Sequence, residues 1–255
     1  MREIIEHIAS TYDRIAENYT RSSRAFNETL MHGEIMALAQ KWGCNFGNST
    51  ALDLGCGPGG LMVRLKKMGA EVYGIDISQK LLEIARGRDL ANLTHGSMHK
   101  VADFYPQESF DLVVSNYALH YLPQEGQELA IRGAYTILKP GGLLVYSLNH
   151  PFFLRGGCFD GEKPSLGRTT DYFSPCRTDS WGQKEFGEEL RMFRMDWPEI
   201  HALNRRAGFD VLELADGVLP ENIDDIITNT SNEEVVNLIN FFRKNPFAVF
   251  VVARK

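Results

Sequence analysis

The segment Ala51–Gly60, ALDLGCGPGG, constrains the fold of this chain more than any other stretch. A short apolar run ends at Gly55, and three further glycines precede an amphipathic stretch over Leu61–Met68. This order predicts a strand, a glycine turn and a helix. Glycine permits positive φ and lets the backbone approach a ligand, while Pro58 should push Gly57 toward an extended conformation. The helix after the turn would begin with free N–H groups.

The glycines alone do not identify the ligand. Their G-x-G-x-x-G spacing also occurs in dinucleotide sites, and a purely structural turn can carry it too. Asp53 lies on the predicted strand, two residues before Gly55. A carboxylate there opposes a pyrophosphate but suits a ligand with positive charge. S-adenosylmethionine, which carries a sulfonium and an ammonium group and no phosphate, fits this pattern.

The composition limits the classes of partner. At 255 residues the chain suits one α/β domain with additions. A net charge of −6 and a pI of about 5.7 disfavour nucleic acid and anionic membrane surfaces. Cys44, Cys56, Cys158 and Cys176 form no C-x-x-C pair, so we expect free thiols and no metal site. The chain shows no signal-peptide pattern and no stretch apolar enough to span a membrane, so we expect a cytoplasmic protein.

Predicted strands and helices alternate along most of the chain. EVYGID, Glu71–Asp76, is typical of a strand, and the apolar run Ser109–Ser115 fits a buried parallel strand. An amphipathic helix at Gln124–Leu138 meets a stop signal in KPGG, Lys139–Gly142. This alternation predicts a parallel sheet with helices on both faces. The other predicted elements are strands at Asn92–Gly96, Gly142–Leu148, Phe209–Leu214 and Phe247–Val252, and helices at Trp197–Ala207 and Ser231–Lys244.

Asp76 ends the second predicted strand, 21 residues after Gly55. An acid at this distance can accept hydrogen bonds from both ribose hydroxyls of an adenosine. A helix-capping or surface carboxylate is the alternative. The alignment of Asp76 with the glycine turn favours the ribose role.

The predicted core carries additions on both sides. Residues 1–42 are expected to form amphipathic helices, in which Tyr12 and Tyr19 recur at helical spacing and would at least dock a helix on the core. Residues 152–196 are rich in aromatics without a sustained period, which predicts an inserted cap or long loop. This cap would cover a pocket for the substrate, or else form a contact in a homodimer. Residues 197–255 would complete the sheet.

Four stretches occur in an order and spacing that resembles the class I S-adenosylmethionine-dependent methyltransferases: LDLGCGPGG, VYGIDIS, SFDLVVSNYALHYL and LKPGGLLVYSL. The leading TYDRIAENY resembles an opening helix of the small-molecule branch, the ubiquinone-biosynthesis type. The resemblance implies an α/β fold, a Rossmann-like doubly wound sheet of seven strands whose last strand is antiparallel. It implies a single domain over residues 1–255, with 1–42 as a helical lid and 51–150 as the cofactor-binding core.

The resemblance implies that nine residues bind S-adenosylmethionine, and Asp53 joins them through its charge. The glycine turn and Asn116 would face the methionine part of the cofactor, and Tyr19 would close over its carboxylate. The full predicted set is Tyr19, Asp53, Gly55, Cys56, Gly57, Asp76, Ile77, Ser97, Met98 and Asn116.

The adenine contacts include one departure from the family pattern. Ile77, Ser97 and Met98 are implied as neighbours of the adenine. The family often has an acid where this chain has Ser97, to accept a hydrogen bond from the adenine amino group. A serine hydroxyl accepts a hydrogen bond more weakly than a carboxylate does.

Methyl transfer requires the protein to align the acceptor with the methyl group and, in some reactions, to remove a proton. His150 follows the fifth predicted strand and is the better candidate base, and His120 follows the fourth. A packed or hydrogen-bonded histidine is the alternative in both cases. Many such reactions need no base.

The expected function is therefore methyl transfer to a small-molecule acceptor, with release of S-adenosylhomocysteine. Methylation of tRNA or protein is the alternative within enzymes, although the acidic balance disfavours nucleic acid. A non-catalytic S-adenosylmethionine-binding module also remains open. A nicotinamide-dependent oxidoreductase shares the glycine turn and the ribose acid, but Asp53 and the NYALHYL segment favour the methyltransferase.

Overall fold

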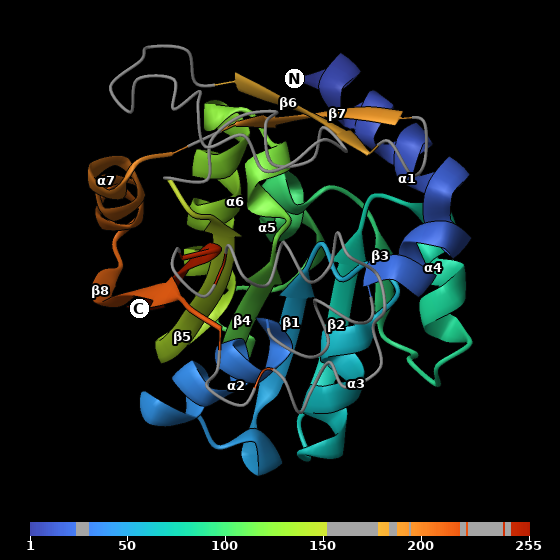
Figure 1. Cartoon of the computed structure of the whole chain (residues 1–255). Helices are drawn as coiled ribbons and strands as arrows, with labels where there is room; N and C mark the ends of the chain where they lie inside the picture. The colour runs from blue at the N-terminus through green and yellow to red at the C-terminus, as the bar shows by residue number, and fades with distance from the viewer. Residues whose placement is uncertain are drawn as a thin grey trace.

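A computed structural model of the chain describes residues 1–23, 31–151, 178–183, 188–193, 195–219, 223, 242 and 246–255. A central sheet is flanked by helices (Figure 1). The helices are α1 (Arg2–Ser23), α2 (His32–Lys41), α3 (Gly60–Lys67), α4 (Gln79–Arg86), α5 (Val101–Phe104), α6 (Gln124–Ile137) and α7 (Trp197–Ala207). The strands are β1 (Thr50–Leu54), β2 (Glu71–Asp76), β3 (Leu93–His95), β4 (Phe110–Asn116), β5 (Leu138–Asn149), β6 (Thr178–Gln183), β7 (Glu188–Phe193), β8 (Asp210–Gly217) and β9 (Ala248–Arg254). None of the helices within these ranges has the length and apolar character needed to cross a bilayer.

Seven strands form one sheet in the order β3-β2-β1-β4-β5-β9-β8. The pairs among the first five strands are parallel, whereas β9 runs antiparallel to both of its neighbours, β5 and β8. The chain winds from β1 to one edge and then returns to extend the sheet from β4 to the other. A crevice is expected at the carboxyl ends of β1 and β4, where the winding direction reverses. The predicted doubly wound sheet of seven strands with an antiparallel last strand is confirmed.

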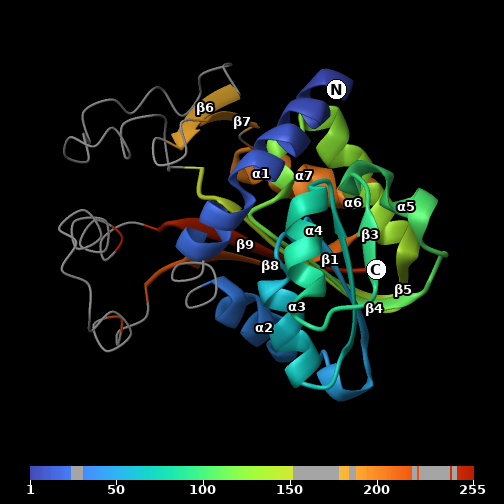
Figure 2. The same cartoon turned by 90° about the vertical axis from the view of Figure 1, so that its right-hand side faces the viewer.

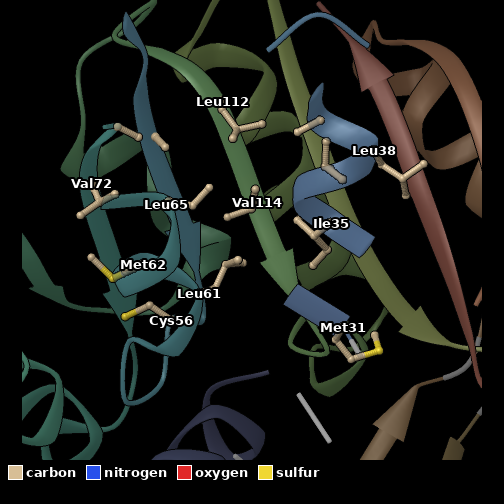
Figure 3. Packing of buried hydrophobic residues seen from close by; sticks show 14 of the residues in the cluster. Met31, Ile35, Leu38, Cys56, Leu61, Met62, Leu65, Val72, Leu112 and Val114 are labelled. Carbon is tan, nitrogen blue, oxygen red and sulfur yellow. The ribbon is translucent and has the colours of Figure 1, made fainter. Parts of the chain in front are cut away.

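Both faces of the sheet are apolar, which explains the two helical layers. Leu112 and Val114 of β4 pack on the face covered by α2, α3 and α4, and Val113 packs on the face covered by α5, α6 and α7. On the first face, Ile35 of α2 and Leu65 of α3 cover the strands (Figure 3). Burial on both sides is the reason that β4 has a nearly continuous apolar sequence.

The predicted turn at Lys139–Gly142 lies within β5, which begins earlier than expected. Leu138 pairs with Phe110 of β4 ahead of a register shift. The N–H of Gly141 donates to the carbonyl of Lys255 at 2.9 Å, and the N–H of Lys255 donates to the carbonyl of Gly142 at 3.0 Å. These bonds with Lys255 hold residues 141 and 142 against the sheet. The local sequence does not predict such a long-range pairing.

The predicted cap, residues 152–196, includes regular structure in its described part. β6 and β7 form an antiparallel pair with Thr178 opposite Phe193. Of the two predicted alternatives, a long irregular loop is wrong for these residues, because two strands that pair with each other need not show an alternating core-facing pattern. The inserted cap stays a prediction. The remaining predictions for this region, on residues 152–177, 184–187 and 194, lie outside the described residues, as does the helix predicted at Ser231–Lys244 apart from Phe242.

Candidate functional site

A cleft lies at the carboxyl ends of the central strands, beneath α1. Its walls come from the glycine turn, the end of β2, the segments after β3 and β4, and the underside of α1. No Lys, Arg or His is among the described residues that line it. The lining residues are Ile5, Ile8, Tyr12, Tyr19, Gly55, Gly57, Ile75, Asp76, Ile77, Leu81, Gly96, Ser97, Met98, Asn116, Tyr117, Ala118, Tyr121 and Leu122.

The glycine turn depends on backbone conformations that side chains resist. Gly55, Gly57 and Gly59 have φ of 73°, 52° and 78°. The prediction that Gly57 would be extended was wrong, because its N–H turns to donate to Oδ2 of Asp76 at 2.8 Å. At Gly55, a Cβ would lie 2.5 Å from the Cβ of Ala118. The glycines therefore leave a cradle beside the cleft that a larger residue would fill.

Asp76 is held ready to accept hydrogen bonds from a ligand. Its Oδ1 accepts from the N–H of Ser78 at 2.8 Å, in addition to the bond from Gly57 to Oδ2. Burial raises the pKa of this carboxyl, whereas the backbone N–H groups of Ser78 and Gly57 oppose the rise. A carboxylate has about four lone-pair sites, so two such bonds leave acceptor capacity toward the cleft.

Asp53 lies behind the glycine turn and is not among the residues that line the cleft. Its side chain is buried, with the residue 3% exposed, and its Oδ1 has no hydrogen-bond partner. Burial, followed by the negative charge of Asp76, raises the pKa of Asp53 to about 8. Oδ1 is thus an unsatisfied acceptor behind the glycine turn, and the role of Asp53 toward a positively charged ligand stays a prediction.

One end of the cleft has the character expected around an adenine ring. Ile77 and Leu81 supply apolar surface from the start of α4, and Met98 supplies it from the turn after β3. Oγ of Ser97 lies 2.7 Å from Nδ1 of His99, so the serine hydroxyl already has an internal partner. Because the hydroxyl already has a partner, Ser97 differs even more from the acid that the resembled family often carries at this position.

Three tyrosines pack together on the cleft, in one cluster with Ile77 and Leu81. The ring of Tyr12 meets those of Tyr19 and Tyr121 edge to face, at centroid distances of 5.2 and 5.8 Å. Burial raises the pKa of Tyr19 and of Tyr12 far above the ordinary tyrosine value. The sequence pattern predicts a docked helix from these residues. The structure shows that Tyr12 both docks α1 and lines the cleft.

The turn after β4 borders the cleft in a strained conformation. Tyr117 has φ of 50°, which is uncommon for a residue with a side chain. Ser147 of β5 stabilises it: its hydroxyl accepts from the N–H of Tyr117 at 3.1 Å and donates to Oδ1 of Asn116 at 2.8 Å. The Tyr117 hydroxyl donates to the carbonyl of Phe247 at 3.2 Å. The contribution of Ser147 has no local sequence signal.

Neither candidate base is among the described cleft-lining residues. His120 is buried between Tyr117 and Tyr121, its Nδ1 has no hydrogen-bond partner, and burial lowers its pKa to about 3. His150 is also buried, and its Nε2 lies 3.1 Å from Oδ1 of Asp216. Burial lowers the pKa of His150, and Asp216 opposes this change. Both imidazoles are therefore neutral near pH 7.

Cys56 contributes to the core rather than to the cleft. Its side chain lies with the buried residues of the α3 layer (Figure 3), where a Cβ at Gly74 would be 2.8 Å from its Sγ. Its N–H donates to the carbonyl of Ile75 at 3.1 Å.

Eight of the ten predicted cofactor residues line the cleft, and Cys56 and Asp53 lie behind it. Across the described residues, no cluster of His, Cys, Asp or Glu could hold a metal ion.

Comparison with known sequences matches residues 51–142 to the model of a family described as a methyltransferase domain. A ubiquinone biosynthesis O-methyltransferase of Hydrogenovibrio crunogenus is 36% identical over 104 residues, which are 39% of this chain and 42% of that protein. The chain spans less than two thirds of the length of this relative and of two other curated relatives.

Two solved structures share the fold. An S-adenosylmethionine-dependent methyltransferase from Mesorhizobium loti is 20% identical with a TM-score of 0.62, over 88% of this chain and 96% of that chain. A Burkholderia thailandensis 1,6-didemethyltoxoflavin-N1-methyltransferase, solved with bound 1,6-didemethyltoxoflavin and S-adenosylhomocysteine, is 15% identical with a TM-score of 0.63. That alignment covers 100% of this chain and 89% of the other.

Proposed function

We propose that this chain, which carries a methyltransferase domain over residues 51–142, transfers a methyl group from S-adenosylmethionine to a small-molecule acceptor. The observation that carries the proposal is the cleft beneath α1. It joins the glycine turn, Asp76 and Asn116 in one site without a basic residue among its described lining. A dinucleotide with a pyrophosphate would find no cation there, whereas a ligand with a sulfonium and an ammonium group suits the nearby Asp53 and Asp76.

Different residues of the cleft would bind different parts of the cofactor. S-adenosylmethionine supplies the electrophilic methyl group when bound. Asp76 would accept hydrogen bonds from the ribose hydroxyls, and Asp53 in its ionised form would balance positive charge at the methionine end. Tyr12 and Tyr19 on α1 would exclude water and hold the cofactor in place. Asn116 would border the side from which the acceptor approaches.

Where the acceptor needs a proton removed, His150 stays the proposed base, as the sequence predicts, although it is not among the described residues that line the cleft. It lies at the end of β5, and the contact with Asp216 orients its ring. The neutral imidazole expected from its lowered pKa is the form that accepts a proton. His120 is the second candidate, but its pKa of about 3 makes it a weak base.

A small molecule is favoured as acceptor over tRNA or protein. The proteins named above include a ubiquinone biosynthesis O-methyltransferase and, among structures that share the fold, an N1-methyltransferase solved with bound 1,6-didemethyltoxoflavin. The net charge of −6 and the absence of Lys or Arg from the described cleft lining disfavour a polyanionic acceptor. β7 packs against α1 and the turn at Leu119–Tyr121, so the described hairpin β6–β7 lies over the same edge of the sheet (Figure 1).

A screen of fractionated metabolites with methyl-labelled S-adenosylmethionine tests this function. The expected result is label in a compound of low molecular mass, together with S-adenosylhomocysteine, and mass spectrometry identifies the product. Label in tRNA or protein instead would support the alternative acceptors. Cofactor binding without turnover on any pool would support a binding module, and NADH binding seen by fluorescence would contradict the cofactor assignment.

A further inference from the structure

Asp13 joins α1 to the first turn of α4. Its Oδ1 accepts from the hydroxyl of Ser78 at 2.6 Å and from the backbone N–H of Lys80 at 3.0 Å. The two helices lie side by side in both views of the molecule (Figures 1 and 2). These bonds bridge 65 and 67 residues of sequence and tie α1 to α4 in the arrangement in which α1 covers the cleft.

Ser78 also connects Asp13 to Asp76 of the proposed ligand-binding site. Its Oγ accepts from the N–H of Leu81 at 3.2 Å and so caps α4, while its own N–H donates to Oδ1 of Asp76 at 2.8 Å. The second carboxylate oxygen of Asp76 accepts from Gly57. A continuous chain of hydrogen bonds therefore runs from Asp13 on α1 through the α4 cap to Asp76 and the glycine turn.

The chemistry of Asp13 suits a closing contact. A carboxylate at the start of a helix is stabilised by the exposed N–H groups and by the positive end of the helix dipole. The same turn of α1 places Tyr12 on the cleft, and Tyr19 lies two turns further along. Movement of α1 away from α4 would remove both rings from the roof and release Ser78 from its partner.

We propose that Asp13 is a positioning residue of the cofactor site, which holds α1 closed and thereby sets how long the cofactor stays bound. The inference rests on the proposed function, because it takes S-adenosylmethionine as the ligand. Release requires α1 to open, so loss of this contact should act mainly on the dissociation rate.

The test compares three variants of the full chain: Asp13→Ala, Asp13→Asn and the control Glu17→Ala, which removes an exposed acid one turn away on the same helix. Stopped-flow measurement with S-adenosylhomocysteine should show about tenfold faster dissociation for Asp13→Ala, with the association rate within about twofold of wild type. Asp13→Asn keeps an acceptor oxygen and should recover part of the loss. Glu17→Ala should match wild type.

Hydrogen exchange of the unliganded protein separates this proposal from the proposed function. Asp13→Ala should increase amide exchange across α1 even if the wild-type protein binds no S-adenosylhomocysteine, an outcome that would contradict only the cofactor assignment. Unchanged dissociation and unchanged α1 exchange in a folded Asp13→Ala protein would overturn the role of Asp13. If Asp13→Ala does not fold, the same two measurements on Asp13→Asn decide the matter.

Discussion

The N–H of Gly57 donates a 2.8 Å hydrogen bond to Oδ2 of Asp76, so the glycine turn and the end of β2 are joined. Oδ1 of the same carboxylate accepts from Ser78. The protein's own N–H groups thereby orient both oxygens, which lowers the cost of ordering the site on binding. The relationship also explains the left-handed conformation of Gly57.

Asp76→Ala should weaken S-adenosylmethionine binding by about one to two orders of magnitude, because charge-assisted hydrogen bonds to the ribose are lost. Isothermal titration calorimetry measures the change. Asp76→Asn keeps one acceptor oxygen and should lie between wild type and Asp76→Ala. Asp89→Ala removes an exposed acid that is paired with Lys66 and serves as the control. Wild-type affinity in Asp76→Ala would contradict the ribose assignment.

Cofactor binding should release close to one proton at pH 7. With a pKa of about 8, the buried Asp53 carboxyl is mostly protonated in the unliganded protein, and a nearby cation favours its ionised form. The affinity should therefore rise with pH up to about 8 and level off above it. Calorimetry in two buffers of different ionisation enthalpy measures the released proton. Asp53→Asn should abolish the release, and an equal proton release in that variant would assign it to another group.

The same carboxyl should destabilise the unliganded fold at high pH. The folded-state pKa of Asp53 lies above its ordinary value of 3.8, so the folded protein binds the proton more tightly than the unfolded chain. Its contribution to stability is fully present below about pH 4 and is lost as the pH rises through about 8. Thermal unfolding at pH 9 should show Asp53→Asn to be more stable than wild type. A wild-type protein as stable as the variant at pH 9 would indicate that Asp53 is ionised without cost.

The lid role of Tyr19 predicts protection of α1 by the cofactor. Limited proteolysis within residues 10–25 should slow markedly when S-adenosylmethionine is present, because closure removes this helix from the protease. Tyr19→Ala should reduce the protection. Equal cleavage with and without cofactor would leave Tyr19 as a packing residue alone.

The two histidines can be separated by their effects on turnover. If His150 removes a proton, His150→Gln should lower kcat with little change in the affinity for S-adenosylmethionine, and Asp216→Asn should lower kcat less, because it disturbs only the orientation of the ring. His120→Gln should alter the packing of Tyr117 and Tyr121 and raise KM rather than remove a titrating base. Full activity in His150→Gln would show that the reaction needs no base at this position.

The local sequence determined the parallel core and much of the cleft. The apolar runs of β1, β2 and β4 predict buried parallel strands, since both of their faces pack against helices. In such a sheet the carboxyl ends of the strands gather at one edge. Gly55 directly follows β1, and Asp76 and Asn116 end β2 and β4, so their positions on the cleft follow from their places in the sequence. Asp53, one position inside its strand, is carried behind that edge for the same reason.

Only the tertiary structure decided what closes and supports the site. Three sets of hydrogen bonds join residues that are distant in sequence. Lys255 bonds to Gly141 and Gly142, Tyr117 bonds to Ser147, and Ser78 bonds to Asp13. The core position of the Cys56 side chain and the neutral state of His120 likewise depend on burial by several elements at once. Hydrophobic periodicity records which face of an element is buried. It carries no information on which distant polar partner satisfies a hydrogen bond there, because that choice is made only when the elements pack together.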